Sequence, residues 1–211
     1  MRLKATNIEH FYGHEKILHG IDLEIEPSKI TAIIGESGSG KTTLLAILSS
    51  LLKPTNGDVY YDDISENSIK DINAFRRKNI GFVFQFHYLI EYLTLKENIA
   101  LGAFDEHNIN TLMENLGIGH LANRYSNEVS GGERQRAAIA RALVNKPSFV
   151  FADEPTGNLD TKNAVGVFEL FKSFNDTTFV VATHDKKIID YADVIIEMED
   201  GVVKCISKKR V

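Results

Sequence analysis

The segment GESGSGKTT, residues 35–43, restricts the possible folds of this chain more than any other feature. It follows the apolar run ITAII at residues 30–34, which is typical of a buried strand, and leads into the helix-like apolar run TTLLAILSSLL at residues 42–52. A glycine-rich turn between a strand and a helix lets backbone N–H groups and the positive end of the helix face an anion. The segment therefore predicts a phosphate-binding loop in an α/β protein.

The residue types in this segment, called the phosphate loop below, fit the pattern G-x-x-x-x-G-K-[ST]. Lys41 would reach the β- and γ-phosphates of a nucleotide, and the hydroxyl of Thr42 would ligate Mg²⁺. The alternative is an ordinary glycine-rich turn, which the strand before it and the helix after it disfavour. The candidate phosphate-binding residues are Gly35, Glu36, Ser37, Gly38, Ser39, Gly40, Lys41, Thr42 and Thr43.

A phosphate loop of this kind needs a carboxylate on a neighbouring strand to hold Mg²⁺, and SFVFADE at residues 148–154 supplies one. Asp153 ends an apolar strand and would bind Mg²⁺ directly or through water. Glu154 comes next, where a carboxylate could polarise the attacking water, an effect worth about 10²–10⁴ in rate. An acidic pair after a strand is by itself more often a solvated turn, so the interpretation depends on the phosphate loop.

The order of patterns along the chain predicts an α/β fold with an insertion. Strand-like runs dominate residues 1–84 and return in residues 147–211, where they alternate with a helical pattern. Residues 85–146 carry mainly helical patterns. We therefore expect a single domain, residues 1–211, with a mainly parallel sheet in its nucleotide-binding core and an inserted helical subdomain.

Composition excludes several classes of protein. The 211 residues have a formal net charge of -5 and contain one cysteine, Cys205. An acidic chain is a poor candidate for nucleic-acid binding, so no nucleic-acid partner is expected. A single cysteine rules out an intrachain disulfide. No apolar run approaches the length of a membrane span, so any work at a membrane requires another chain to do the spanning.

A second glycine pair opens the helix-like run EVSGGERQRAAIARAL at residues 128–143. Ser130 offers a hydroxyl, Gly131 and Gly132 offer bare N–H groups, and the helix adds its dipole, so this segment also suits a phosphate. One nucleotide does not need two such loops from a single chain.

A family resemblance explains the second loop. GESGSGKTT, Gln85 after a strand, VSGGE, FADEP, GNLD and THD occur in the order found in the nucleotide-binding subunits of ABC transporters, and together they cover almost the whole chain. The resemblance implies a P-loop ATPase core with an antiparallel β subdomain and a helical subdomain. It also implies two subunits packed head to tail, each VSGGE signature loop (residues 129–133) closing on the ATP of the other subunit.

The resemblance also implies roles for single residues. Tyr12 matches the aromatic residue that stacks on adenine, with Phe11 as a rival. Gln85 matches the glutamine that senses Mg²⁺, and Asp160 the residue of the loop that couples the two sites. His184 matches the switch histidine at the γ-phosphate. The implied catalytic residues are Lys41, Glu154 and His184. The implied metal ligands are Thr42, Gln85 and Asp153. The residues expected to contact the partner subunit's nucleotide are Ser130, Gly131 and Gly132.

The branch of the family is suggested by FQFHYLIEYLTLKENIA, SGGERQRAAIARALVNKP and ADEPTGNLD, which resemble the LolD-type lipoprotein-releasing ATPases. FtsE-type division ATPases and MacB-type macrolide or peptide exporters remain open. The resemblance implies ATP and Mg²⁺ as cofactors and a homodimer bound to an integral membrane permease. It places the protein peripherally on the cytoplasmic face of the bacterial inner membrane. The loop FHYLIEYLT at residues 86–94 is the expected permease contact. The departure VSGGE from the commoner LSGGQ leaves Ser130 and Gly132 in place.

Two other classes are disfavoured. DNA-repair ATPases of the SMC class share the signature but place a long coiled coil between the two ATP motifs, and no sustained heptad pattern lies between Lys41 and Asp153. Translation factors with two such cassettes are excluded by the single phosphate loop.

Overall fold

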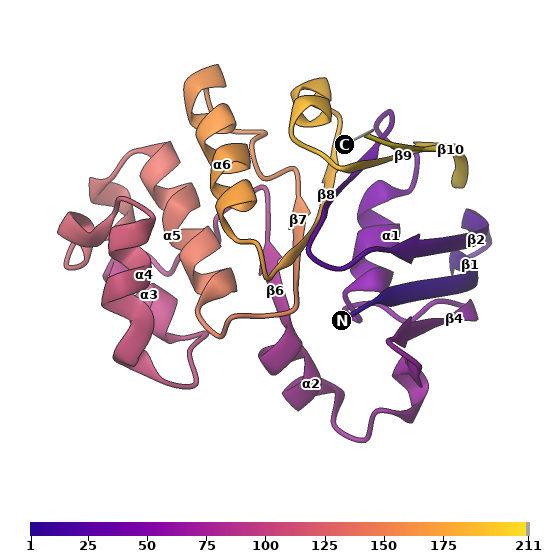
Figure 1. The fold of residues 1–211 in the computed structure, drawn as a ribbon, viewed down its shortest axis with the longest axis horizontal. Coiled ribbons are helices and arrows are strands. Elements are labelled where there is room, and N and C mark those ends of the chain that lie inside the picture. The colour runs from indigo at the N-terminus through magenta and orange to yellow at the C-terminus, as the bar shows by residue number, and fades with distance from the viewer. Residues whose placement is uncertain (210–211) are drawn as a thin grey trace.

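A six-stranded sheet forms the centre of the molecule in the computed structural model, which describes residues 1–209 (Figure 1). The strand order is β10-β9-β3-β8-β7-β6, and only the β9–β10 pair is antiparallel. The predicted mainly parallel sheet is therefore confirmed. Its strands are β3 (Ile30–Ile34), β6 (Ile80–Val83), β7 (Phe149–Asp153), β8 (Thr178–Thr183), β9 (Val194–Glu199) and β10 (Val202–Lys208).

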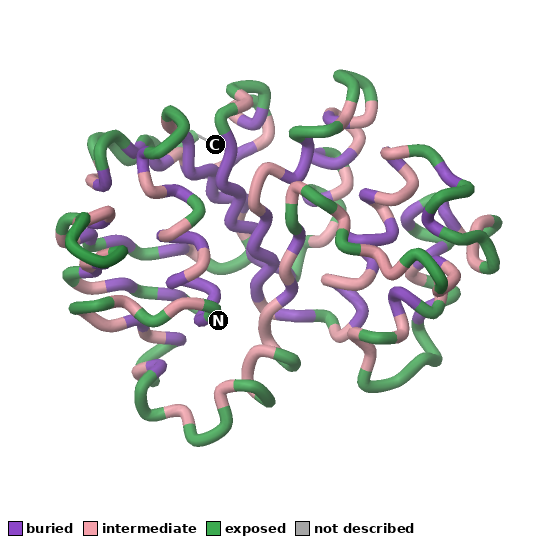
Figure 2. The backbone as a smooth tube through the Cα atoms, turned by 180° about the vertical axis from the view of Figure 1, so that it is seen from behind, coloured by how far each residue is buried: buried purple, intermediate pink, exposed green. Residues whose placement is uncertain are grey.

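The central strands are continuous apolar runs because both faces of the sheet are covered. Alternate residues of β7 point to opposite faces, so Phe151 packs with helix α1 (Lys41–Leu48), whereas Val150 packs with helix α6 (Thr161–Ser173). Figure 2 shows this buried strand layer running through the middle of the chain. The helix predicted over residues 42–52 ends at Leu48, and Ser50 adopts a left-handed backbone with φ 57°.

A second, antiparallel sheet lies beside α1, with the order β2-β1-β4-β5. Its hydrophobic side joins the same core as α1, through residues such as Leu3, Ile8 and Leu18. The predicted antiparallel β subdomain has its counterpart here. The strands are β1 (Leu3–Tyr12), β2 (Glu15–Ile25), β4 (Asn56–Tyr61) and β5 (Ile64–Ser65).

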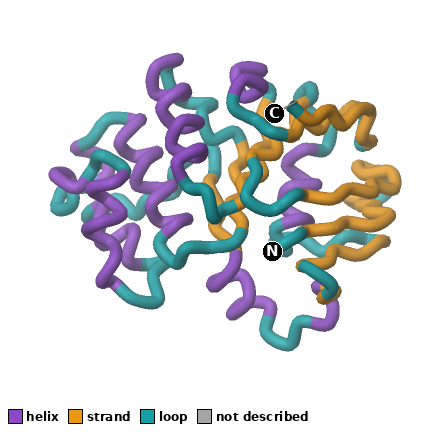
Figure 3. The backbone as a smooth tube through the Cα atoms, in the orientation of Figure 1, coloured by secondary structure: helices purple, strands orange, loops and turns teal. Residues whose placement is uncertain are grey.

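Helices dominate the end of the molecule opposite the antiparallel sheet (Figure 3). They enclose a hydrophobic cluster of their own, to which Leu95, Ile109 and Ala137 each contribute. The helices are α3 (Leu95–Ala100), α4 (Ile109–Asn115) and α5 (Gly131–Leu143). The same region has the short 3₁₀ turns η2 (Glu106–Asn108), η3 (Gly119–Leu121) and η4 (Ser126–Glu128). Two further 3₁₀ turns follow β5 and β8, namely η1 (Glu66–Ser68) and η5 (Lys186–Asp190). The division into a core and a helical subdomain at residues 85–146 stays a prediction, and residues 210–211 lie outside the described part.

Two local features differ from the sequence patterns. Helix α2 (Ile72–Asn79) was not anticipated; the side chain of Asp71 caps it by accepting a hydrogen bond from the Ala74 N–H at 2.9 Å. The helical patterns expected across residues 85–146 are interrupted where α3 ends at Ala100, and beyond it the Asn145 side chain donates to the carbonyl of Gly102 at 2.7 Å. A tertiary contact from a distant residue thus accompanies this helix end.

We predict that Gly81→Ala destabilises the fold. A Cβ at Gly81 on β6 would lie 2.3 Å from the backbone oxygen of Ala142 on α5, so strand and helix would have to separate. Overpacking of this kind costs about 2–3 kcal/mol, which urea unfolding would measure. Gly166→Ala is the matched control, since its Cβ would meet only the flexible end of Arg136 at 3.0 Å. Equal midpoints for both variants would contradict the prediction.

Candidate functional site

A cleft of about 560 Å³ lies at the carboxyl ends of the parallel strands, where ligands of open α/β sheets commonly bind. Segments distant in sequence meet here: the end of β1, the phosphate loop, the residue two positions after β6, and the residues after β7 and β8. The lining residues are Tyr12, Ile17, Ser37, Gly38, Gly40, Lys41, Thr42, Thr43, Gln85, Glu154 and His184. Apart from Ile17, every one is a residue that the sequence analysis singled out.

The phosphate loop presents free backbone donors to this cleft. Gly38 and Gly40 have φ of 84° and 92°, a left-handed conformation that favours glycine. Gly40 is the N-cap of α1 and no side chain caps the helix, so its first N–H groups are available to an anion. A Cβ on Gly38 would meet no atom within 4 Å, which keeps the approach open. The loop therefore suits the phosphates of a nucleotide.

Lys41 adds a positive charge beneath the loop. Its side-chain nitrogen donates to the carbonyl oxygens of Gly35 at 2.9 Å and Glu36 at 2.7 Å, and contacts the hydroxyl of Ser39 at 3.4 Å. The residue is 8% exposed. Burial lowers the pKa of Lys41, while the nearby carboxylate of Glu154 acts in the opposite direction. The ammonium group is held within the loop.

Thr42 and Asp153 bring two oxygen ligands together. The Thr42 hydroxyl donates to the Asp153 carboxylate at 3.1 Å. Burial raises the pKa of Asp153, and the hydrogen bond from Thr42 opposes that shift. In residues 1–209 no group of three His, Cys, Asp or Glu side chains could hold a metal unaided. The pair fits Mg²⁺, which binds to one or two protein oxygens and completes its shell with water and substrate phosphates.

We predict that Asp153→Asn stabilises the protein when no nucleotide or Mg²⁺ is added. A raised pKa means that ionising Asp153 costs folding free energy at neutral pH, and this cost disappears as pH falls through that pKa. The melting temperature at pH 7.5 should rise by about 2 °C, and the gain should vanish on acidification. Asp176→Asn, at an exposed site, serves as the control in a fluorescence melting series. A lower melting temperature for Asp153→Asn at pH 7.5 would contradict this account.

Glu154 is held in one orientation by the last residues of β8 and by His184, which follows the strand. Its carboxylate accepts hydrogen bonds from the Thr183 hydroxyl at 2.8 Å and the His184 N–H at 3.0 Å. Its backbone is left-handed with φ 47°, which costs a non-glycine residue about 1 kcal/mol or more, and its N–H binds the Ala182 oxygen at 2.8 Å. Strain of this kind often accompanies functional sites. The sequence analysis missed Thr183, although it directly precedes the candidate histidine.

His184 also touches Glu154 through its ring. The Nδ1 atom lies 2.8 Å from the Glu154 carboxylate. An ionised carboxylate can only accept, so Nδ1 carries the proton in this contact. The other ring nitrogen remains available at the cleft, where His184 is part of the wall.

Tyr12, rather than Phe11, lines the cleft and is 55% exposed. The ring of the buried His10 packs edge-on against Tyr12, with the centroids 4.9 Å apart. Phe11 instead lies under the ammonium group of Lys16 at 5.5 Å. Tyr12 and the unanticipated Ile17 together offer an apolar surface suited to the flat face of a nucleobase.

The signature loop lies outside this cleft. Ser130 caps α5 in a reciprocal arrangement with Glu133, whose carboxylate accepts from the Ser130 N–H at 2.7 Å. Gly131 is open, since a Cβ there would meet no atom closer than 3.9 Å. Gly132 is close to Asn163, whose Oδ1 would lie 2.8 Å from an added Cβ. The loop can therefore face a ligand, but not the one in its own cleft.

The remaining predicted residues lie around the cleft. Asp160 caps α6 by accepting from the Asn163 N–H at 2.9 Å. Gly35, Glu36 and Ser39 line a neighbouring cavity on the other side of the phosphate loop. The structure thus brings ten predicted residues to one cleft, places Asp153 beside it through Thr42, and leaves Ser130, Gly131, Gly132 and Asp160 outside.

The family model for ABC transporters matches residues 18–157 of this chain. The chain belongs to the ABC transporter family. It is an ABC ATPase, an enzyme that binds and hydrolyses ATP for a transporter. Within residues 1–209 this ATPase has no helix long and apolar enough to cross a membrane.

Three relatives each cover at least 95% of this ABC ATPase. The LolD lipoprotein-releasing ATP-binding protein of Cytophaga hutchinsonii is 44% identical over 95% of this chain and 98% of its own. The bacitracin export protein BceA of Halalkalibacterium halodurans is 39% identical over 95% of this chain and 86% of its own. A solved dimer of an ATP-binding cassette in a post-hydrolysis state, bound to ADP and Pi, shares 36% identity with a TM-score of 0.89, covering 99% of both chains. The predicted family and fold class are confirmed.

Proposed function

We propose that this ABC ATPase closes as a homodimer around two Mg–ATP and thereby drives a membrane permease that releases lipoproteins. The observation that carries the ATP part is the meeting of Lys41, the Thr42–Asp153 pair and the Glu154–His184 pair at one cleft. ATP binding would favour the closed dimer, and loss of the γ-phosphate would let it open.

Within each site the geometry supports the following proposed roles. Lys41 and the phosphate-loop N–H groups bind the β- and γ-phosphates, and Tyr12 stacks on adenine. Bound Mg²⁺ would neutralise phosphate charge, with Thr42, Asp153 and Gln85 as the residues that hold it or its waters. Glu154 orients and deprotonates the attacking water. His184, fixed by Glu154, faces the γ-phosphate.

The dimer is supported by the separation of the two phosphate-binding loops. Ser130 and Gly131 lie outside the cleft that their own phosphate loop lines, yet Gly131 is open to a ligand. A second copy packed head to tail would place each signature loop against the other copy's nucleotide. The solved relative at 36% identity is a dimer bound to ADP and Pi.

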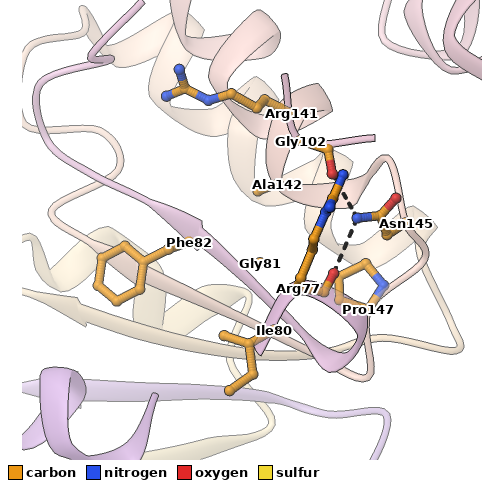
Figure 4. A pocket seen from close by; sticks show the side chains of 9 residues that line it. All are labelled: Arg77, Ile80, Gly81, Phe82, Gly102, Arg141, Ala142, Asn145 and Pro147. Atoms are coloured by element: carbon orange, nitrogen blue, oxygen red, sulfur yellow. Dashed lines mark hydrogen bonds between the residues drawn. The ribbon is translucent and has the colours of Figure 1, made fainter. Parts of the chain in front are cut away.

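The pocket drawn in Figure 4, which is lined by residues of β6, of α5 and by Gly102, is the surface that we propose for the permease. Asn145 holds this pocket together by donating to the carbonyls of Arg77 at 3.1 Å and Gly102 at 2.7 Å. Tyr88 is 64% exposed, and its ring packs edge-on against Phe84, which in turn packs against Phe82 of the pocket. Exposed aromatic side chains beside a preformed pocket suit an apolar helical segment of a partner. This arrangement supports a peripheral position on the cytoplasmic face of the inner membrane.

Lipoprotein release is favoured as the task because LolD proteins are 40–44% identical to this chain over most of its length. Export of a peptide is the second candidate, since the bacitracin exporter BceA matches at 39%. An FtsE-like role in division would use the same ATP cycle with a different membrane partner.

The test uses Glu154→Gln as bait in the native host. Membranes are solubilised with Mg–ATP, and captured proteins are identified by mass spectrometry. A permease recovered together with lipidated proteins supports lipoprotein release, whereas a permease without them favours export or division. Adding Tyr88→Ser to the bait should reduce permease recovery while ATP-driven dimerisation persists. Recovery of no membrane protein by the parent bait would overturn the permease partnership.

A further inference from the structure

Gln85 is held from two sides by the segment that leads to Asp160. The side-chain amide of Asn158 donates to the backbone oxygen of Gln85 at 3.1 Å. The Gln85 side chain lies against Gly157, because a Cβ on Gly157 would be 3.2 Å from its Nε2 and 3.5 Å from its Cδ. Main chain and side chain of Gln85 are thus positioned by adjacent residues of one loop.

The other end of that loop contacts the signature helix. Asp160 accepts from the Asn163 side chain at 2.8 Å, and Asn163 in turn packs on Gly132 of the signature loop. Residues 157–163 therefore form a continuous connection between Gln85, at the cleft, and Gly132, outside it. The hydrogen bond between Asn158 and Gln85 is exposed, and neither residue belongs to the hydrophobic clusters beside it.

We propose that Asn158 is a positioning residue that sets where Gln85 stands toward bound Mg²⁺ and transmits that position through residues 157–163 to the signature loop. The inference rests on the proposed ATP-driven dimer. A shift of Gln85 within the cleft would move Asn158 and Gly157 with it. Asp160 and Gly132 then change position together, which aligns the surface that meets the partner subunit.

The two asparagines, Asn158 and Asn163, have different roles. Asn163 is tied to Asp160 within the first turn of α6, so its bond is local and belongs to the helix cap. Asn158 reaches across to a residue 73 positions away, and its bond exists only while Gln85 is in this place. Asn158 is therefore the member whose loss separates the two loops without uncapping α6.

The test measures the metal requirement of dimerisation in the Glu154→Gln background. Asn158→Leu keeps the volume of the side chain and removes the donor. The Mg²⁺ concentration for half-maximal dimerisation with saturating ATP, followed by light scattering after size exclusion, should rise roughly fivefold, the effect of one neutral hydrogen bond. Affinity of the ATP complex for Mn²⁺, read by electron paramagnetic resonance, should fall by a similar factor. ATP affinity in EDTA should stay within twofold.

Three further variants keep the inference falsifiable. Gly157→Ala should shift the Mg²⁺ requirement in the same direction, because its Cβ displaces the Gln85 side chain. Gln85→Ala with Asn158→Leu should be no worse than Gln85→Ala alone, since Asn158 acts through Gln85. Asn67→Ala, which removes an exposed asparagine bonded to Asp58 at 3.0 Å, should match the parent.

An unchanged Mg²⁺ requirement for both Asn158→Leu and Gly157→Ala would overturn the inference, as would additive losses in the double variant. Equal weakening of ATP binding in EDTA would also overturn it, because the effect would then be general. If the Glu154→Gln parent itself fails to dimerise with Mg–ATP, the proposed function fails first. If the Glu154→Gln parent dimerises normally and the Asn158 variants do not behave as expected, only the proposed role of Asn158 fails.

Discussion

Lys41→Ala is expected to lower the affinity for ATP by roughly 100-fold or more. Lys41 supplies the only lysine ammonium among the residues lining the cleft, and hydrogen bonds to charged groups contribute about 1.5–3 kcal/mol each. Removing it also leaves the Gly35 and Glu36 carbonyl oxygens without the donor they now share. Isothermal titration calorimetry with ATP measures the loss directly.

The matched control for this variant is Lys204→Ala. Lys204 is an exposed lysine paired with Glu199 at 3.1 Å, and it lines the neighbouring cavity rather than the cleft. Its removal should leave ATP affinity within twofold. Circular dichroism should show both variants folded. An ATP affinity for Lys41→Ala within threefold of the parent would refute the proposed role of the phosphate loop.

Glu154→Gln is expected to reduce ATP hydrolysis by about 10²–10⁴ while leaving ATP binding intact. An amide keeps the shape of the side chain but cannot take a proton from water. Its carbonyl oxygen can still accept from the His184 N–H, and its NH₂ group can donate to the Thr183 hydroxyl, so the local structure should persist. The closed dimer with ATP should therefore accumulate, as measured by size exclusion with Mg–ATP.

Thr183→Val provides a comparison for this variant. It removes the hydroxyl that donates to Glu154 at 2.8 Å but leaves the carboxylate in place. Hydrolysis should fall by about tenfold, and the dimer should accumulate less than with Glu154→Gln. Wild-type turnover by Glu154→Gln would show that Glu154 is not the base. A monomeric Glu154→Gln at high concentration with Mg–ATP would contradict the two-subunit site.

Much of the fold and site could be predicted because the motifs are local. The phosphate loop lies within nine consecutive residues, and the strand before it and the helix after it are adjacent in sequence. Asp153 and Glu154 follow directly on an apolar strand, and the ends of parallel strands meet at one edge of a sheet. Their convergence with Thr42 and His184 thus follows from the fold class.

Contacts between loops could not be predicted in the same way. Two hydrogen bonds join residues that are far apart in sequence, Asn158 with Gln85 and Thr183 with Glu154. The local sequence around each residue does not indicate its partner. The end of α3 is similar, since Asn145 binds Gly102 across the fold. Side-chain hydrogen bonds of this kind depend on where loops end after the cores have packed.

The sequence by itself determined the α/β class, the phosphate loop, the carboxylates and the two-loop signature, because each is encoded by residue type at short spacing. Only the tertiary structure decided which aromatic residue lines the cleft, how Glu154 is oriented and what holds Gln85. The register shift at His10 and Phe11, where β2 has the extra residue Ile17, for example, precedes Tyr12, the residue that reaches the cleft. Such choices depend on strand register and packing over long separations, which a residue pattern does not contain.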